Sequence, residues 1–367
     1  MSAPSTTGPD RAPEDLDGLR IGMLAPIAWR TPPVHYGPWE LVASMLTERL
    51  VRRGIDVTLF ATADSITSAR LDAVAPHGYT EDPAMDGRVW EALHVAHALE
   101  GSSGVDLVHN HLDWLPLAFD AQWRAPLVTT VHGFSAPGIL PAYERSRSAF
   151  VSISDADRAP GVRYAATIPH GVDVDALPLG LGGEDLVVFG RMHPDKGIVD
   201  AIDIARQTGR RLILCGIIQD EAYFRELVMP RIDDDRVVYV GSVTAAERPM
   251  VLGGAAALLH PVHFDEPFGL SVAEAMACGT PVVAYARGAM PEVIDPGVTG
   301  ILVDPRTEDR IVRAARAVDA AVTLDRGRVR ARARERFDAD RMVDAYLDVY
   351  RDVVARNPRQ TLRARAS

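Results

Sequence analysis

Residues 263–292 restrict the fold of this chain more than any other stretch. Pro267 and Gly269 interrupt the apolar pattern and predict a loop. The small apolar residues 270–277 then predict a helix, because a glycine and a proline follow shortly after them. A short apolar run, 282–285, predicts a buried strand. We therefore expect a loop, a buried helix, a second loop and a strand, in that order.

Two glutamates flank the start of this predicted helix. Its first N–H groups lack partners within the helix and its dipole is positive there, so the helix mouth can bind an anion. Glu266 and Glu274 would face that mouth from either side, which suits a phosphorylated ligand that also carries hydroxyls. Taken singly, each has a simpler explanation: Ser271 and Glu274 fit a capping box, and Glu266 fits a solvated loop. Together with Glu292 and the surrounding glycines and prolines, they favour a site.

The N-terminal half also alternates strands and helices. Apolar runs predict strands at 19–25 and 56–61, and residues 40–50 between them have helical apolar spacing. This order predicts a parallel sheet that binds ligands at the carboxyl ends of its strands. Gly37, within the aromatic loop 29–39, is therefore expected at a ligand-facing helix mouth.

Two later strands of this half end in histidines. His109 and His111 end the strand 105–111 and share one face, because side chains alternate along a strand. A metal site there is disfavoured, since no third ligand stands at suitable spacing. His132 ends the strand 127–133. A lone histidine at a strand end is usually structural, but its position before a glycine favours a functional role.

Basic residues mark the start of the second half. Residues 177–183 predict a linker, and 185–190 predict a buried strand. Arg191 and Lys196 follow on the loop before the next helix, where two cations would neutralise a diphosphate. Lys196 is the only lysine among 39 basic residues, as expected for a compact phosphate-binding ammonium. The alternative is a solvated basic loop.

Two other charged segments are expected to lie in solvent. The aspartates 233–235 could hold a metal ion, but they precede the strand 237–240 at its amino end, away from the predicted ligand edge. The arginine-rich helix 326–336 is expected to be a solvated face. Residues 337–354 then predict a long amphipathic helix.

Length and composition limit the class of protein. A chain of 367 residues has room for about two domains, and its net charge of −11 argues against a nucleic-acid partner. No apolar run reaches the roughly 18 residues that a membrane span needs, so membrane association is not expected. Residues 1–17 predict an unstructured tail rather than a signal peptide. Cys215 and Cys278 are expected to fill the core of a cytoplasmic protein.

The signature in residues 266–294 resembles the donor-binding motif of glycosyltransferase family 4. It consists of Glu266-x7-Glu274 with Pro-Phe-Gly-Leu inside, then Glu-Ala-Met-Ala-x-Gly-Thr-Pro-Val-Val and Gly-x-x-Pro-Glu-Val-Ile. The resemblance covers roughly residues 19–355 and implies an α/β protein of the GT-B fold. Two Rossmann-like domains would then face each other across a cleft, and the last helix would cross back to the first domain.

The resemblance also divides the chain and assigns roles to residues. The acceptor-binding domain would comprise 18–176 and 337–356, the donor-binding domain 184–336, and the basic tail 357–367. Catalytic roles fall on His132, Glu266, Arg191 and Lys196. Donor contacts fall on these last three and on Gly37, Gly241, Phe268, Gly269, Leu270 and Glu274. Acceptor contacts fall on Tyr36, Trp39 and His111. Tyr36 and Trp39, like Trp29, are equally well explained as packing aromatics. The chain departs from the family at Tyr36, where glycine is usual, and at His170, where asparagine is commoner.

The implied activity is a retaining, metal-independent transfer of a hexose from a nucleotide-diphosphate sugar to a hydroxyl acceptor, without a cofactor. UDP-glucose is the first donor to consider and GDP-mannose the second. The aromatic loop 29–39 favours a small organic acceptor, such as a natural product, over a lipid. A GT-B sugar-nucleotide epimerase is the main alternative, but it needs further acid–base carboxylates that we cannot place. A non-catalytic sugar-nucleotide-binding protein would be expected to lack His132 or Glu266, and both are present.

Overall fold

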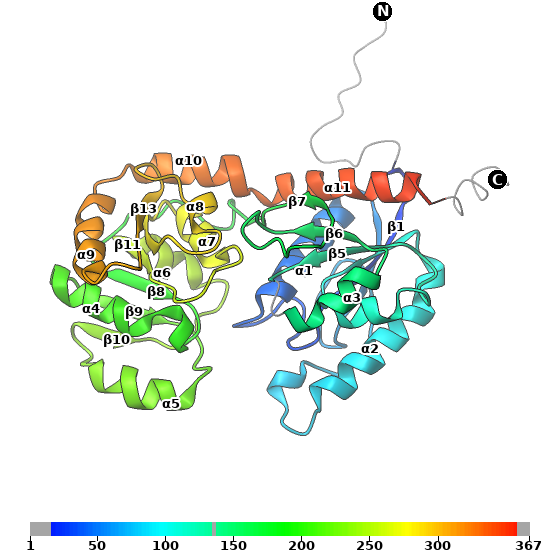
Figure 1. The fold of residues 1–367 in the computed structure, drawn as a ribbon, viewed down its shortest axis with the longest axis horizontal. Coiled ribbons are helices and arrows are strands. Elements are labelled where there is room, and N and C mark those ends of the chain that lie inside the picture. Colours follow the sequence, from blue (N-terminus) through cyan, green and yellow to red (C-terminus); the bar gives the residue numbers. More distant parts are fainter. Residues whose placement is uncertain (1–15, 134–136, 358–367) are drawn as a thin grey trace, which may run out of the picture.

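The computed structural model describes residues 16–133 and 137–357, which form two domains (Figure 1). The first contains a seven-stranded parallel sheet in the order β3-β2-β1-β4-β5-β6-β7. Its strands are β1 (Arg20–Leu24), β2 (Asp56–Phe60), β3 (Arg70–Asp72), β4 (Leu107–Asn110), β5 (Leu127–Val131), β6 (Ala149–Ser152) and β7 (Tyr164–Thr167). Its helices are α1 (Pro38–Arg52), α2 (Gly87–Gly101) and α3 (Leu140–Arg145).

The second domain contains a six-stranded parallel sheet in the order β10-β9-β8-β11-β12-β13. Its strands are β8 (Leu186–Phe189), β9 (Leu212–Cys215), β10 (Val237–Tyr239), β11 (Ala257–His260), β12 (Val282–Tyr285) and β13 (Gly300–Val303). The helices that follow the first domain are α4 (Ile198–Thr208), α5 (Glu221–Tyr223), α6 (Arg248–Gly254), α7 (Leu270–Ala277), α8 (Met290–Val293), α9 (Arg310–Ala321), α10 (Arg326–Phe337) and α11 (Ala339–Ala355). Two parallel sheets covered by helices confirm the predicted fold class.

The predicted strand–helix–strand unit is present as β1, α1 and β2. The helix begins at Pro38, two residues earlier than its apolar spacing indicated, because proline is compatible with the first helical position and Gly37 precedes it as the N-cap. Gly37 has φ +145°, and a Cβ there would lie 2.9 Å from both Pro33 Cβ and Glu40 Oε2. The close packing of this loop therefore requires glycine.

The last two helices join the domains from one side. Figure 1 shows α10 over the second domain and α11 over the first. Between them, the Val172 N–H donates to the Phe337 carbonyl at 2.7 Å, and the Ala339 N–H donates to the Val172 carbonyl at 3.1 Å. The two passages of the chain between the domains therefore lie side by side. Beyond them, α11 buries Met342, Tyr346 and Tyr350 in the core of the first domain.

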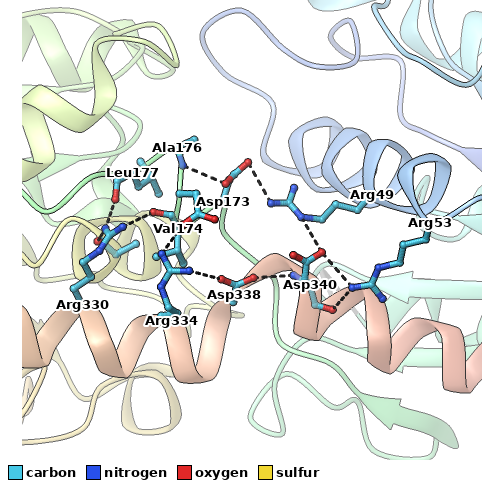
Figure 2. A network of polar contacts seen from close by, with 12 residues as sticks. Arg49, Arg53, Asp173, Val174, Ala176, Leu177, Arg330, Arg334, Asp338 and Asp340 are labelled. Atoms are coloured by element: carbon cyan, nitrogen blue, oxygen red, sulfur yellow. Dashed lines mark hydrogen bonds and ion pairs between the residues drawn. The ribbon is translucent and has the colours of Figure 1, made fainter. Parts of the chain in front are cut away.

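Arginines hold this crossing together, as Figure 2 shows. Arg330 of α10 donates to the Val174 carbonyl at 2.7 Å, and Arg49 of α1 pairs with Asp173 at 3.2 Å. Arg326 of α10 donates to several carbonyls, including that of Gly253 at 2.8 Å. The prediction of a solvated basic face for 326–336 is therefore wrong for Arg326 and Arg330. Their partners include backbone carbonyls of the linker and of the ends of α6 and α7.

Glu292, the third carboxylate of the stretch 263–292, also contacts the other domain. Its carboxylate accepts from the N–H groups of Asp155 and Ala156 at 2.9 and 2.6 Å. This residue of α8 therefore ties the second domain to the loop after β6. Within residues 16–133 and 137–357, no helix is long and apolar enough to cross a membrane. The predicted tails lie almost wholly outside the described residues.

Candidate active site

A cavity of about 540 Å³ lies between the domains, where the carboxyl ends of both sheets meet. Side chains that follow β5 and β8 line it, as the parallel-sheet pattern predicts. Of the predicted site residues, the cavity is lined by Tyr36, Gly37, Trp39, His132, Arg191, Lys196, Glu266, Gly269, Leu270 and Glu274. Three others are not among the lining residues: His111, Gly241 and Phe268.

The three residues that do not line the cavity lie behind its walls or beside residues that line it. Phe268 is 2% exposed and packs its ring against His170 and Phe337. The Gly241 carbonyl accepts from the N–H of Gly216, which does line the cavity. His111 is fully buried behind His132. Side-chain contact with a ligand in this cavity is therefore not shown for any of the three.

Lys196 and Glu266 form the centre of the second domain's side of the cavity. The Lys196 ammonium lies 2.7 Å from Glu266 Oε2 and 4.5 Å from the centre of the Phe264 ring. His260 Nε2 lies 3.3 Å from the same carboxylate oxygen. Burial alone would raise the pKa of Glu266, but the positive charge of Lys196 and the close approach of the His260 ring lower it to about 2. Glu266 is therefore an ionised, buried carboxylate rather than a solvated one.

Arg191 is held at the end of β8 by the loop that it begins. Its guanidinium pairs with Asp195 at 2.8 Å and also donates to the Gln219 side chain. The Lys196 side chain packs near Gly190 on the same loop. Two cations thus lie together at the cavity, each beside a carboxylate that a more highly charged anion could replace.

The mouth of α7 opens into the same cavity. Gly269 precedes it with φ +84°, and a Cβ there would lie 2.7 Å from Met290 Cε, so a larger residue would be strained. No side chain caps this helix. Glu274 instead pairs with Arg248 of α6, which rules out the capping-box interpretation. Burial raises the pKa of Glu274, and the Arg248 charge opposes that effect only in part.

Arg248 lines the cavity and was not singled out from the sequence. Its position in a helix could nevertheless have indicated it. Arg248 is the first residue of α6, where the helix dipole disfavours a positive charge. A cation at such a position implies a partner elsewhere, and the partner is Glu274.

Buried histidines form the first domain's side. His111 Nδ1 lies 2.8 Å from His132 Nε2, and His132 Nδ1 lies 3.1 Å from His170 Nε2. We call His111, His132 and His170 the histidine row. Burial lowers the pKa of His111 and of His170 to about 3, and holds that of His132 well below its ordinary value. The Trp39 ring stacks on His132 at 5.2 Å.

Other polar residues for which a structural role was predicted do take structural roles. The Asp233 carboxylate accepts from the N–H groups of Asp235, Arg236 and Val237 in the turn before β10. His109 bonds Tyr350 and Thr130 in the core. Across the described part of the chain, no group of three or more His, Cys, Asp or Glu side chains is placed to hold a metal ion. Cys215 and Cys278 are buried and free, as predicted.

Two family models match consecutive parts of this chain. The model described as Glycosyltransferase Family 4 matches residues 40–176, and that described as Glycosyl transferases group 1 matches residues 175–335. The glycogen synthase of Mycobacterium tuberculosis is 27% identical, over 88% of this chain and 93% of its own. The D-inositol 3-phosphate glycosyltransferase of Saccharomonospora viridis is 27% identical, over 87% and 90%. In structure, a glycosyltransferase involved in avilamycin A biosynthesis aligns with a TM-score of 0.71 at 22% identity, over 92% of this chain and 99% of that chain.

Proposed function

This chain belongs to the family 4 type of glycosyltransferases with the GT-B fold, and from that premise we propose its reaction. A hexose moves from a nucleotide-diphosphate sugar to a hydroxyl acceptor, with retention of anomeric configuration and without a metal ion. The observation that carries the proposal is the shared cavity: Arg191, Lys196 and the mouth of α7 line it together with Glu266 and Glu274.

The donor's diphosphate would lie against Arg191, Lys196 and the N-terminus of α7. Its negative charge would replace the Asp195 and Glu266 carboxylates as partner of these cations, which would then stabilise the charge of the leaving nucleotide. Glu274 would accept hydrogen bonds from the ribose hydroxyls, and Glu266 from hydroxyls of the transferred sugar. The glycosidic bond to the phosphate breaks as the acceptor oxygen bonds the same face of the anomeric carbon, and the leaving phosphate takes the acceptor's proton.

The first domain's lining favours an uncharged acceptor. Its described lining residues include the aromatic rings of Tyr36 and Trp39 and the side chain of Asp157, but no arginine or lysine. A phosphorylated acceptor such as inositol 3-phosphate, named for some relatives, would lack a permanent cation on this side. We therefore propose a neutral, hydroxyl-bearing small molecule, which fits between aromatic rings more readily than an anion does.

Nucleotide binding tests the donor site. UDP, GDP, ADP and dTDP are compared by thermal shift with EDTA present, since a ligand that binds only the folded state raises the melting temperature. A shift with UDP directs the next assay to UDP-glucose, and a shift with GDP directs it to GDP-mannose. No shift with any nucleotide would refute the donor assignment.

Turnover then separates the proposed reaction from its alternatives. Release of nucleotide that requires a neutral polyol or natural-product acceptor supports transfer. Donor epimerisation without an acceptor would identify an epimerase, and binding without turnover would identify a non-catalytic protein. Anomeric configuration of the product, read by NMR coupling constants, decides between retention and inversion.

A further inference from the structure

His170 belongs to the histidine row, and the proposed reaction assigns it no role. It follows β7 and precedes Gly171, at the place where the chain leaves the first domain. Its side chain is buried between His132 of the first domain and the edge of the Phe268 ring of the second, 5.3 Å away. It is therefore held from both domains and is directed at the histidine that lines the cavity.

Both ring nitrogens of His132 are engaged by other imidazoles. A neutral imidazole has one N–H and one lone pair, so His132 must donate to one neighbour and accept from the other. If His111 donates to His132, then His132 donates to His170; if His170 donates, the order is reversed. The tautomer of His132 is consequently tied to that of His170.

No group at either end of the histidine row fixes which nitrogens donate. His111 Nε2 and His170 Nδ1 are buried and have no hydrogen-bond partner among the described residues. No carboxylate or carbonyl therefore imposes a direction from either end. The orientation of the His132 ring is set by the row on its edges and by Trp39 on its face.

We infer that His170 is a positioning residue for the proposed transfer. It acts through His132, tying the tautomer of that neutral ring to its own and keeping the ring flat against Trp39 beside the sugar. A neutral ring there does not oppose positive charge that develops on the sugar, whereas an imidazolium would. This inference rests on the proposed function.

The test compares His170→Leu with His170→Gln. Leucine removes the bond to His132 Nδ1, whereas the glutamine amide reaches about as far as Nε2 of histidine and restores it. His94→Leu is the matched control, because His94 is also buried in the first domain but bonds the Ala25 carbonyl, and neither of these two residues lines the cavity. Circular dichroism and UDP or GDP titration confirm that each variant is folded and binds nucleotide.

We expect His170→Leu to lower kcat about tenfold with the donor KM changed less than twofold, and His170→Gln to recover most of the loss. The nitrogen-15 NMR signals of His132 should change in His170→Leu and stay near wild type in His170→Gln. Unchanged His132 signals in His170→Leu, or an equal loss of kcat in His94→Leu, would overturn the inference. If the wild type binds nucleotide but has no turnover, the proposed function fails, and the NMR result still decides whether His170 positions His132.

Discussion

The two domains hold the polar side chains at the cavity in place in different ways. On the second domain, ionised partners neutralise each other: Lys196 with Glu266, and Arg248 with Glu274. We call these four residues the charged wall. On the first domain, the histidine row is uncharged because burial lowers the pKa of each member, and hydrogen bonds between imidazoles hold it.

The difference follows from what each side would face. A diphosphate carries charge into the cavity, so the charged wall must offer cations while keeping them paired until the ligand arrives. The sugar and a neutral acceptor would bring no charge, so the histidine row on the opposite side can be uncharged.

Removing one member of the central ion pair should have the largest effect. Lys196→Ala leaves the Glu266 carboxylate buried without its main cation, so we expect the free energy of unfolding to fall by about 3 kcal/mol. Turnover should fall at least tenfold, about 1.4 kcal/mol of lost transition-state stabilisation. Chemical denaturation and steady-state kinetics measure the two effects.

A double variant separates these two effects of Lys196. Adding Glu266→Gln to Lys196→Ala removes the unpaired carboxylate and should recover most of the stability without recovering turnover. Recovery of both would mean that Lys196 acts only through folding, and the phosphate assignment would then fail.

Mild acid should weaken the histidine row before it affects the pair of Lys196 and Glu266. The pKa of His170 is about 3 in the folded protein and about 6.5 in an unfolded chain, so between these values the unfolded state binds more protons. Stability therefore falls as pH falls from 6.5, by about 2 kcal/mol for such a group by pH 5. Glu266, with a folded pKa of about 2, loses its contribution only below about 4.5.

Urea denaturation of wild type and His170→Gln at pH 7, 6 and 5 measures this window. Glutamine does not titrate, so the variant should lose less stability than wild type between pH 7 and 5. Equal losses would show that His170 binds no fewer protons in the folded state than in the unfolded one.

The outer pair of the charged wall should affect nucleotide binding. Arg248→Ala leaves the Glu274 carboxylate buried and unpaired, which raises its pKa further and favours its protonated form. A protonated Glu274 is a weaker acceptor for ribose hydroxyls, so we expect nucleotide affinity to fall about tenfold, or about 1.4 kcal/mol. Isothermal titration calorimetry measures it.

Arg225→Ala is the control for this change, because Arg225 pairs with Glu226 at the exposed surface. Its nucleotide affinity should equal that of wild type. An Arg248→Ala affinity within twofold of the control would remove Arg248 from the nucleotide site.

The aromatic face of the first domain should give the smallest effect. Trp39→Phe replaces an indole by a smaller ring, which reduces the overlap with the His132 ring and the contact with an acceptor. We therefore expect the acceptor KM to rise about threefold, or about 0.7 kcal/mol. The donor KM should stay the same. A change in the donor KM alone would place Trp39 at the donor instead, and would remove the proposed division between the two sides.

Local patterns were sufficient to predict where most of the elements lie. The strands before Arg191 and His132, and α7 after Gly269, were predicted from runs of apolar residues and from glycine and proline positions. Parallel strands then bring their carboxyl ends to one edge of each sheet, which predicts that Arg191 and Lys196 lie at the ligand edge of one sheet and His132 at that of the other. That these two edges face each other across a cleft was implied only by the family resemblance. The basic helix α10 lies where it was predicted, but its surroundings were not predicted, because charge alone does not show whether an arginine meets water or backbone carbonyls.

Thus the amino-acid sequence determined the elements, the parallel sheets and the edge at which a ligand site forms, since these depend on residues close together in the chain. Only the tertiary structure decided which side chains pair with one another. Glu274 meets Arg248 across 26 positions and His132 meets His170 across 38, between elements whose mutual packing no local pattern encodes. Most of the predicted site residues therefore line the cavity, whereas their charges and tautomers depend on burial and neighbours that only the packed domains supply.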